Sequence, residues 1–207
     1  MIMQYGFHFE GSRCIGCRTC VFACKDFNHL SPEVTYRKVY EYEGGSWSKV
    51  EEAWAPSLYV YHLSLACNHC DDPACTKVCP TEAMRKDAET GLVAVDADRC
   101  IGCGYCAMAC PYGVPVVDRE KGYSVKCDGC AERVAEGKSP VCVESCSLRC
   151  LDFGPVDELR TRYGSEAGIA PLPDPDFTHP NLCITPPASA RPWSDTDGII
   201  ANKTEVL

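Results

Sequence analysis

The sequence predicts an α+β protein made of short strands and short helices around several cysteine-rich loops. Two observations predict this class. Sixteen of the 18 cysteines fall into four groups of four. The stretches between the groups contain short segments with the alternating pattern of β-strands.

The four groups have the spacing of metal ligands. Two of them read Cys-x2-Cys-x2-Cys-x3-Cys, and two of them are followed directly by proline. This spacing is typical of bacterial ferredoxins, in which cysteine thiolates hold 4Fe-4S clusters. The sequence therefore predicts four 4Fe-4S clusters. In chain order the groups are Cys14, Cys17, Cys20 and Cys24; Cys67, Cys70, Cys75 and Cys79; Cys100, Cys103, Cys106 and Cys110; and Cys127, Cys130, Cys142 and Cys146.

The groups are expected to work in pairs. In two-cluster ferredoxins the fourth cysteine of a run binds the other cluster, because it follows the third too closely to fold back. Groups two and three lie close together in the sequence and form the inner pair, so groups one and four pair around them. The predicted ligand sets are Cys14, Cys17, Cys20 and Cys146 for cluster 1; Cys24, Cys127, Cys130 and Cys142 for cluster 2; Cys67, Cys70, Cys75 and Cys110 for cluster 3; and Cys79, Cys100, Cys103 and Cys106 for cluster 4.

This nested pairing predicts two bacterial ferredoxin-like modules related by a pseudo-twofold axis. The outer module combines residues 1–30 and 120–155, and the inner module spans residues 67–119. Residues 31–66 form an inserted β-hairpin region, and residues 156–207 form a short helix and an extended Pro-rich C-terminal arm.

The inserted region is expected to contain strands at Thr35–Tyr42 and Leu58–Leu65, with Gly44-Gly45-Ser46 as a turn between them. Its tryptophans, Trp47 and Trp54, are interpreted as core or subunit-interface residues.

In the inner module, Ala83–Lys86 and Leu92–Val95 predict a hairpin that turns at Thr90-Gly91. A short helix is expected around Val156–Tyr163, ending at Gly164. Seven of the 22 residues from Pro171 to Pro192 are proline, which excludes a helix or a central strand there. We expect this arm to lie along its own core or along a partner subunit.

Charge and hydropathy narrow the function classes. The formal charge is -9, and four oxidised clusters with their thiolates bring the nominal charge to about -17. Such a negative field argues against binding to nucleic acid. No apolar stretch approaches the roughly eighteen residues that span a bilayer. The first ligand follows the N-terminus too closely for a secretory signal, so export would need another carrier.

Two other uses of cysteine fit less well. Zinc sites close with four ligands, which leaves the third cysteine of each triple run without a role. Disulfides are disfavoured by the close spacing of the cysteines and by the missing secretory signal.

Cys150 and Cys183 lie outside the four groups and are interpreted as non-ligands, either buried or free thiols. The sequence shows no nucleophile–base pair, phosphate loop or open metal site, so we expect no catalytic site of its own.

The motif order resembles the iron-sulfur B subunit of anaerobic dimethyl sulfoxide reductase over nearly the whole chain. The residues that carry the resemblance are Gln4-Tyr5-Gly6-Phe7, Cys67-Asn68-His69-Cys70, Cys110-Pro111-Tyr112-Gly113, Lys126-Cys127-Asp128-Gly129-Cys130, Leu151-Asp152-Phe153-Gly154-Pro155 and Ala170-Pro171-Leu172-Pro173.

The resemblance implies an electron-transfer subunit in a three-part enzyme for anaerobic respiration. Electrons would pass from a membrane anchor that oxidises menaquinol, through four clusters, to a molybdopterin catalytic subunit that reduces an S-oxide, N-oxide or related acceptor. The B subunit would be exported folded, with a catalytic partner that carries a twin-arginine signal, to the outer face of the cytoplasmic membrane. Otherwise the complex would be cytoplasmic. A beta subunit of a formate dehydrogenase or of a polysulfide or thiosulfate reductase is the alternative, and a zinc-stabilised scaffold is the non-redox alternative.

Two details refine the resemblance. Cys103 is present where nitrate reductase relatives carry a tryptophan, which implies that all four clusters are 4Fe-4S. The last group departs from the family pattern, because Ser147 follows Cys146 in place of proline and Cys150 stands where a small apolar residue is expected.

Overall fold

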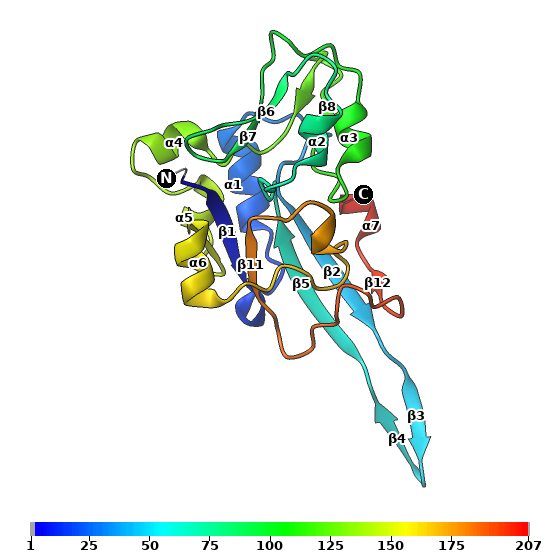
Figure 1. Ribbon diagram of the computed structural model, residues 1–207. Coiled ribbons are helices and arrows are strands. Elements are labelled where there is room, and N and C mark those ends of the chain that lie inside the picture. The colour runs from blue at the N-terminus through cyan, green and yellow to red at the C-terminus, as the bar shows by residue number, and fades with distance from the viewer. Residues whose placement is uncertain (1–2, 207) are drawn as a thin grey trace.

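Two three-stranded sheets form the main body of the computed structural model, which describes residues 3–206 (Figure 1). In the first sheet the central strand β1 (Tyr5–Glu10) lies antiparallel to β10 (Leu151–Pro155) and parallel to β11 (Leu182–Thr185). In the second sheet β2 (Lys38–Gly44) pairs antiparallel with β12 (Ile199–Ile200) and β5 (Tyr59–Leu65). The structure is therefore α+β, as predicted.

Strand β1 was not predicted, although its aromatic residues Tyr5, Phe7 and Phe9 alternate with Gly6, His8 and Glu10. Its four middle residues are all buried. A central strand that is covered on both faces buries both its polar and its apolar side chains, and the His8 ring nitrogen Nε2 lies 2.9 Å from the Thr185 hydroxyl. Phe7 packs against Phe153 of β10 with ring centroids 4.7 Å apart, and Phe9 is fully buried.

The predicted pair of strands in residues 31–66 is confirmed as β2 and β5. Tyr61, Leu63 and Leu65 are buried, and Val60 next to Tyr61 is exposed, as the alternation predicts. Tyr61 lies opposite Tyr42 of β2, with ring centroids 5.5 Å apart. Cross-strand aromatic pairs of this kind stabilise the sheet.

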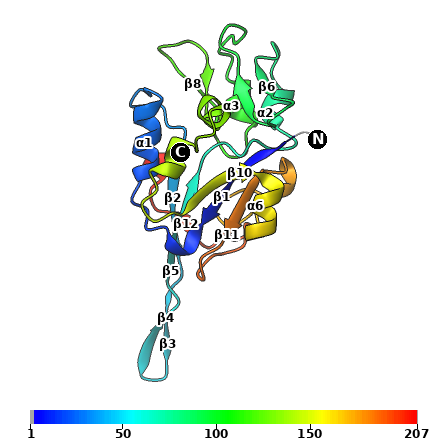
Figure 2. The same ribbon diagram turned by 90° about the vertical axis from the view of Figure 1, so that its left-hand side faces the viewer.

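The turn predicted at Gly44-Gly45-Ser46 is wrong. The chain passes through these residues into a second hairpin of β3 (Trp47–Val50) and β4 (Ala53–Pro56), which turns at Glu51-Glu52. Figures 1 and 2 show this hairpin projecting from the body as a long ribbon. Trp47 and Trp54 are 56% and 64% exposed, so the interpretation of these residues as core is also wrong.

The inner module predicted from groups two and three lies in an upper lobe of short elements (Figure 1). Strands β6 (Met84–Lys86) and β7 (Val93–Val95) confirm the predicted hairpin to within one residue at each N-terminal end. Cys75, Met84, Val93 and Cys106 form a small core of their own. Half of this core therefore consists of predicted ligands. The lobe also contains α2 (Ala74–Lys77), α3 (Tyr105–Ala109), β8 (Val116–Val117) and β9 (Ser124–Val125).

The remaining helices are short. Helix α6 occupies the predicted Val156–Tyr163 and stops at Gly164, whose φ is +88°.

The Pro-rich segment contains the 3-10 helix η2 (Pro175–Phe177) and the strand β11 at the sheet edge, a position compatible with flanking prolines. Within residues 3–206 no helix has the length and apolar character needed to cross a membrane. The other helices are η1 (Gly11–Arg13), α1 (Thr19–Phe27), α4 (Ala131–Ala135), α5 (Val141–Glu144) and α7 (Lys203–Val206).

Candidate metal centres

Each cysteine group begins in a loop that contains residues in the left-handed conformation. Positive φ angles occur at Gly16 and Arg18, at His69, at Gly102 and Gly104, and at Gly129 and Cys130. Such residues let a loop curl tightly, which glycine does at little cost. The curl brings the first cysteines of each group around a common space.

Two pairs of groups share their local structure. In groups one and three a Cys-x-Gly-Cys loop leads into a helix, α1 or α3, that carries the third cysteine. In groups two and four a proline caps a four-residue helix, α2 or α5, that carries the third cysteine at its second position. The four groups thus follow two alternating local patterns.

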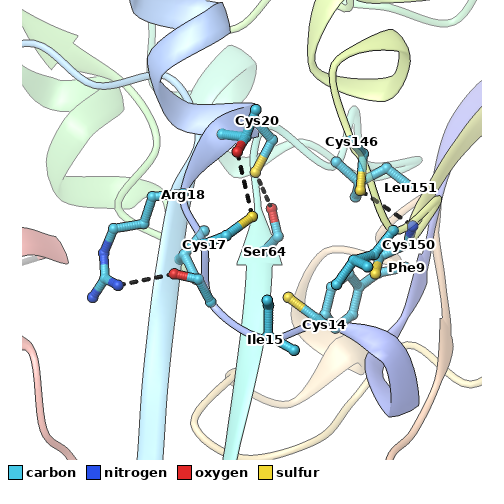
Figure 3. Close-up of a pocket in the computed structure, with 14 residues that line it drawn as sticks. Phe9, Cys14, Ile15, Cys17, Arg18, Cys20, Ser64, Cys146, Cys150 and Leu151 are labelled. Carbon is cyan, nitrogen blue, oxygen red and sulfur yellow. Dashed lines mark hydrogen bonds between the residues drawn. The ribbon is translucent and has the colours of Figure 1, made fainter.

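The first neighbourhood joins the N-terminal loop to the end of α5. Figure 3 shows Cys14, Cys17, Cys20 and Cys146 surrounding one pocket, with Cys150 beside them. The Cys20 thiol lies 3.4 Å from the Ser64 hydroxyl, and the Cys17 thiol lies 3.4 Å from the hydroxyl of Thr19.

The pocket consists mainly of sulfur and apolar groups. Burial raises the pKa of the Cys14 thiol, and the nearby thiols of Cys20, Cys146 and Cys17 raise it further. The structure thus brings together all four cysteines predicted for cluster 1.

The second neighbourhood joins α1 to group four. Burial raises the pKa of the Cys24 thiol most strongly, followed by the thiols of Cys127 and Cys142 and, more weakly, Cys130. All four of these cysteines are buried. The structure thus brings together the four cysteines predicted for cluster 2.

The third neighbourhood joins group two to the end of α3. Burial raises the pKa of the Cys75 thiol to about 12, and Cys67, Cys110 and Cys70 contribute to the rise. Cys110 comes from group three, directly after α3. These are the four cysteines predicted for cluster 3.

The fourth neighbourhood lies in the upper lobe. Cys79, Cys100, Cys103 and Cys106 line one pocket together with Met84, Val95 and Ser124. Backbone N–H groups donate to two of these sulfurs, from Met84 to Cys79 at 3.4 Å and from Ser124 to Cys100 at 3.3 Å. These are the four cysteines predicted for cluster 4, and hydrogen bonds to ligand sulfurs help to set cluster potentials.

The residues present fit 4Fe-4S clusters. Each neighbourhood offers four thiols, and apolar side chains surround the pocket beside Cys14 and the one beside Cys79. Within residues 3–206 no three His, Cys, Asp or Glu side chains converge closely enough for a single metal ion. A cluster bound in each neighbourhood would carry one electron at a time, and the protein would set its potential.

The two cysteines outside the groups are both buried and free of disulfides. Cys183 lies on β11 and packs against Val156 and Leu159 of α6, away from the four neighbourhoods. Cys150 lines the first pocket, and its backbone N–H donates to the Cys146 sulfur at 3.2 Å. Their interpretation as non-ligands stays a prediction, and Cys150 is the one that needs a test.

The fold gives several residues beside the ligands surroundings that the sequence does not show. His69 is fully buried between groups two and four, and its Nδ1 accepts from the backbone N–H of Val93 at 2.9 Å. The other ring nitrogen therefore carries the proton, and the Cys127 thiol lies beside the ring. Lys126 is buried next to Cys127, and Ser124 contacts the thiol of Cys106. The sequence places His69 between Cys67 and Cys70 and Lys126 next to Cys127, but it does not show their burial or their contacts.

Comparison with known proteins gives matches across the chain. A family model described as a 4Fe-4S dicluster domain matches residues 58–156, and one described as a 4Fe-4S binding domain matches residues 11–36. The sequence is 58% identical over 206 residues to "Probable anaerobic dimethyl sulfoxide reductase chain YnfG" of Escherichia coli K12, and the match covers 100% of both proteins.

Two further relatives are B subunits of anaerobic dimethyl sulfoxide reductase. The protein from Escherichia coli K12 is 57% identical over 206 residues, covering 100% of both sequences. The protein from Haemophilus influenzae is 53% identical over 204 residues, covering 98% of this sequence and 99% of the relative.

Proposed function

We propose that this protein transfers electrons along a path of four clusters inside a respiratory reductase. It belongs to the family of iron-sulfur B subunits of anaerobic dimethyl sulfoxide reductases. It is a non-catalytic electron-transfer subunit of an oxidoreductase complex, and its cofactors are 4Fe-4S clusters. The observation that supports this electron-transfer path is the set of four cysteine neighbourhoods. Each of them combines three cysteines of one group with one cysteine of another.

The neighbourhoods have an order that suits stepwise transfer. Cys20 and Cys24 lie one turn apart on α1, so clusters 1 and 2 would be neighbours. His69 lies between ligands of cluster 3 in the sequence and beside the Cys127 thiol, so clusters 2 and 3 would be neighbours. Cys75 and Cys79 flank the end of α2, which links clusters 3 and 4. The proposed path therefore runs 1, 2, 3, 4.

The two ends of this path are the neighbourhoods that contain an exposed cysteine. Cys17 and Cys103 are the two exposed cysteines of the described residues, whereas all four ligands proposed for cluster 2 are buried. Exposed apolar side chains accompany each end, Ile15 beside Cys17 and Ile101 beside Cys103. An exposed cluster edge with apolar surroundings suits the docking of a redox partner.

Two partners follow from the proposed role. A molybdopterin catalytic subunit would reduce an S-oxide, N-oxide or related acceptor at one end of the path. A membrane anchor that oxidises menaquinol would supply electrons at the other. We further propose that the protein is exported folded with a catalytic partner bearing a twin-arginine signal.

The two alternating ligand patterns support the nested modules proposed from the sequence. Groups one and three share one local structure and groups two and four share the other. We propose that residues 1–30 with 120–155 and residues 67–119 form two ferredoxin-like modules related by a pseudo-twofold axis. Residues 31–66 would be the inserted region, and residues 156–207 the helix and Pro-rich arm.

The direct test is metal content combined with electron flow. The full-length protein, purified anaerobically, is expected to contain roughly sixteen iron and sixteen sulfide atoms, four of each per cluster. In the complex with its catalytic partner, dithionite-reduced clusters should be reoxidised when dimethyl sulfoxide is added. Roughly eight iron atoms per molecule in place of the sixteen expected for four clusters, or clusters that stay reduced while the partner turns over, would contradict the proposal.

A further inference from the structure

A fully buried arginine lies between the first two cysteine neighbourhoods. Arg37 precedes β2 and is 2% exposed. Its Nη1 donates to the backbone oxygen of Ser64 at 3.3 Å and to the Ser64 hydroxyl at 3.2 Å. The guanidinium carbon lies 4.8 Å from the centre of the Phe7 ring. The side chain is thus held on one side by β5 and on another by β1.

The rest of the guanidinium has no partner among the described residues. Among residues 3–206 no carboxylate lies within ion-pair distance of Arg37, and its Nε and Nη2 find no hydrogen-bond acceptor. A buried cation without a counter-charge is strongly unfavourable. Its N–H groups keep a fixed fork geometry that suits anionic acceptors.

Four predicted cluster ligands lie near Arg37, and a bound cluster would bring the missing negative charge to them. Against desolvation, which lowers the pKa of Arg37, the cysteines Cys142, Cys20, Cys127 and Cys24 raise it. Cys20 belongs to the set proposed for cluster 1, and the other three belong to the set for cluster 2. The Ser64 hydroxyl that accepts from Arg37 also lies 3.4 Å from the Cys20 sulfur.

We propose that Arg37 is a positioning residue shared by clusters 1 and 2, whose guanidinium supplies their common counter-charge and directs its two unpaired nitrogens, Nε and Nη2, at cluster or ligand sulfur. This inference rests on the proposed function, because it assumes the ligand sets given above. Each cluster gains one electron, from a neighbouring cluster or from a redox partner, and no proton, so its charge becomes more negative. A fixed cation stabilises that reduced form and raises the reduction potential of both clusters.

The test is a redox titration of the full-length protein followed by electron paramagnetic resonance. Arg37→Met removes the charge at similar length, and Arg37→Lys keeps the charge but not the fork. Arg162→Met is the matched control, because Arg162 is an exposed arginine on α6. At the wild-type midpoint potential, Arg37→Met should raise the oxidised-to-reduced ratio of clusters 1 and 2 at least tenfold, which is about 59 mV for a one-electron couple.

Arg37→Lys should recover most of this shift, and clusters 3 and 4 should change less than threefold in every variant. Unchanged potentials in Arg37→Met, or an equal shift of all four clusters, would overturn the inference. If the Arg37→Met protein fails to hold cluster 1 or 2, the comparison of Arg37→Lys with Arg37→Gln tests the inference instead. The reduction potentials of clusters 1 and 2 must then be higher in Arg37→Lys than in Arg37→Gln. A wild-type protein without four clusters would instead contradict the proposed function.

Discussion

At the scale of single residues, the candidate ligands stand out in the sequence, and their surroundings do not. Cysteine spacing is a local property, so the sixteen candidates could be grouped from the sequence alone. Arg37 and His69 act across sequence separations that no local pattern reveals, since Arg37 meets Ser64 and His69 meets Val93. The sequence places His69 between Cys67 and Cys70, but the burial and the partners of both residues follow only from the fold.

Cys150 offers a residue-scale prediction. Cys150→Ala should retain all four clusters, because Cys146 keeps the x3 spacing and fills the fourth position of the first neighbourhood. Cys146→Ala should change the signal of cluster 1 alone. Iron content and electron paramagnetic resonance of the reduced proteins check this pair. Loss of cluster 1 in Cys150→Ala, with a normal spectrum in Cys146→Ala, would make Cys150 the ligand.

Core packing gives a second prediction at this scale. Leu63 on β5 is 1% exposed within the main core. Truncation of such a side chain typically costs about 2–5 kcal/mol. Leu63→Ala should therefore lose its cluster absorbance at a clearly lower temperature than the wild type. Val60→Ala, at an exposed position of the same strand, should change this temperature little; an equal loss in both variants would contradict the packing argument.

At the scale of elements, local patterns predicted the strand pairs β2–β5 and β6–β7 and the helix α6, whereas the first sheet was missed. β1 pairs Phe7 with Leu182 of β11 and with Phe153 of β10. These partners lie more than a hundred residues away in the sequence. The prolines that flank β11 also suppress any strand signal there.

The projecting hairpin was missed because Gly44-Gly45-Ser46 looks like a turn. Gly45 has a φ of +95°, and the Ser57 N–H donates to the Ser46 oxygen at 2.9 Å, so the ribbon continues past the glycines. An isolated two-stranded hairpin has little stability of its own in water. Its cross-strand register places Trp47 and Trp54 on one face, since Trp47 pairs with Pro56 and Lys49 pairs with Trp54.

This arrangement predicts a role in assembly for the hairpin. Trp47→Ser with Trp54→Ser should leave the four clusters and the thermal stability of the isolated protein nearly unchanged, because exposed substitutions usually alter stability by about 0.5 kcal/mol or less. Binding to the catalytic partner, measured by co-purification at increasing dilution, should weaken. Trp193→Ser, at another exposed tryptophan, is the control. Undiminished binding in the double variant would exclude the hairpin from the interface.

At the scale of the whole molecule, stability should depend on the clusters. Predicted ligands make up a large part of the buried core, including Cys20, Cys67, Cys127 and Cys142 in the main cluster of apolar residues. Without clusters these cysteines are free thiols that no metal centre joins to one another. Metal binding contributes folding free energy directly.

Removal of the clusters by oxidation and chelation should therefore unfold most of the protein. Far-ultraviolet circular dichroism and size-exclusion chromatography under reducing conditions check this expectation. The upper lobe should expand most, because half of its small core is cysteine. An apo-protein that keeps native secondary structure and size would show that the apolar core suffices without metal.

The central claim is that the cysteine groups exchange fourth ligands and so hold four clusters in one ordered electron-transfer path. The most direct test is the electron paramagnetic resonance spectrum of reduced Cys24→Ser, compared with Cys17→Ser and Cys130→Ser, which identify the signals of clusters 1 and 2. Cys183→Ser serves as a control outside the four sets. We predict that Cys24→Ser reproduces the change seen in Cys130→Ser and keeps the signal of cluster 1. A spectrum that instead reproduces Cys17→Ser would contradict the nested pairing and the path built on it.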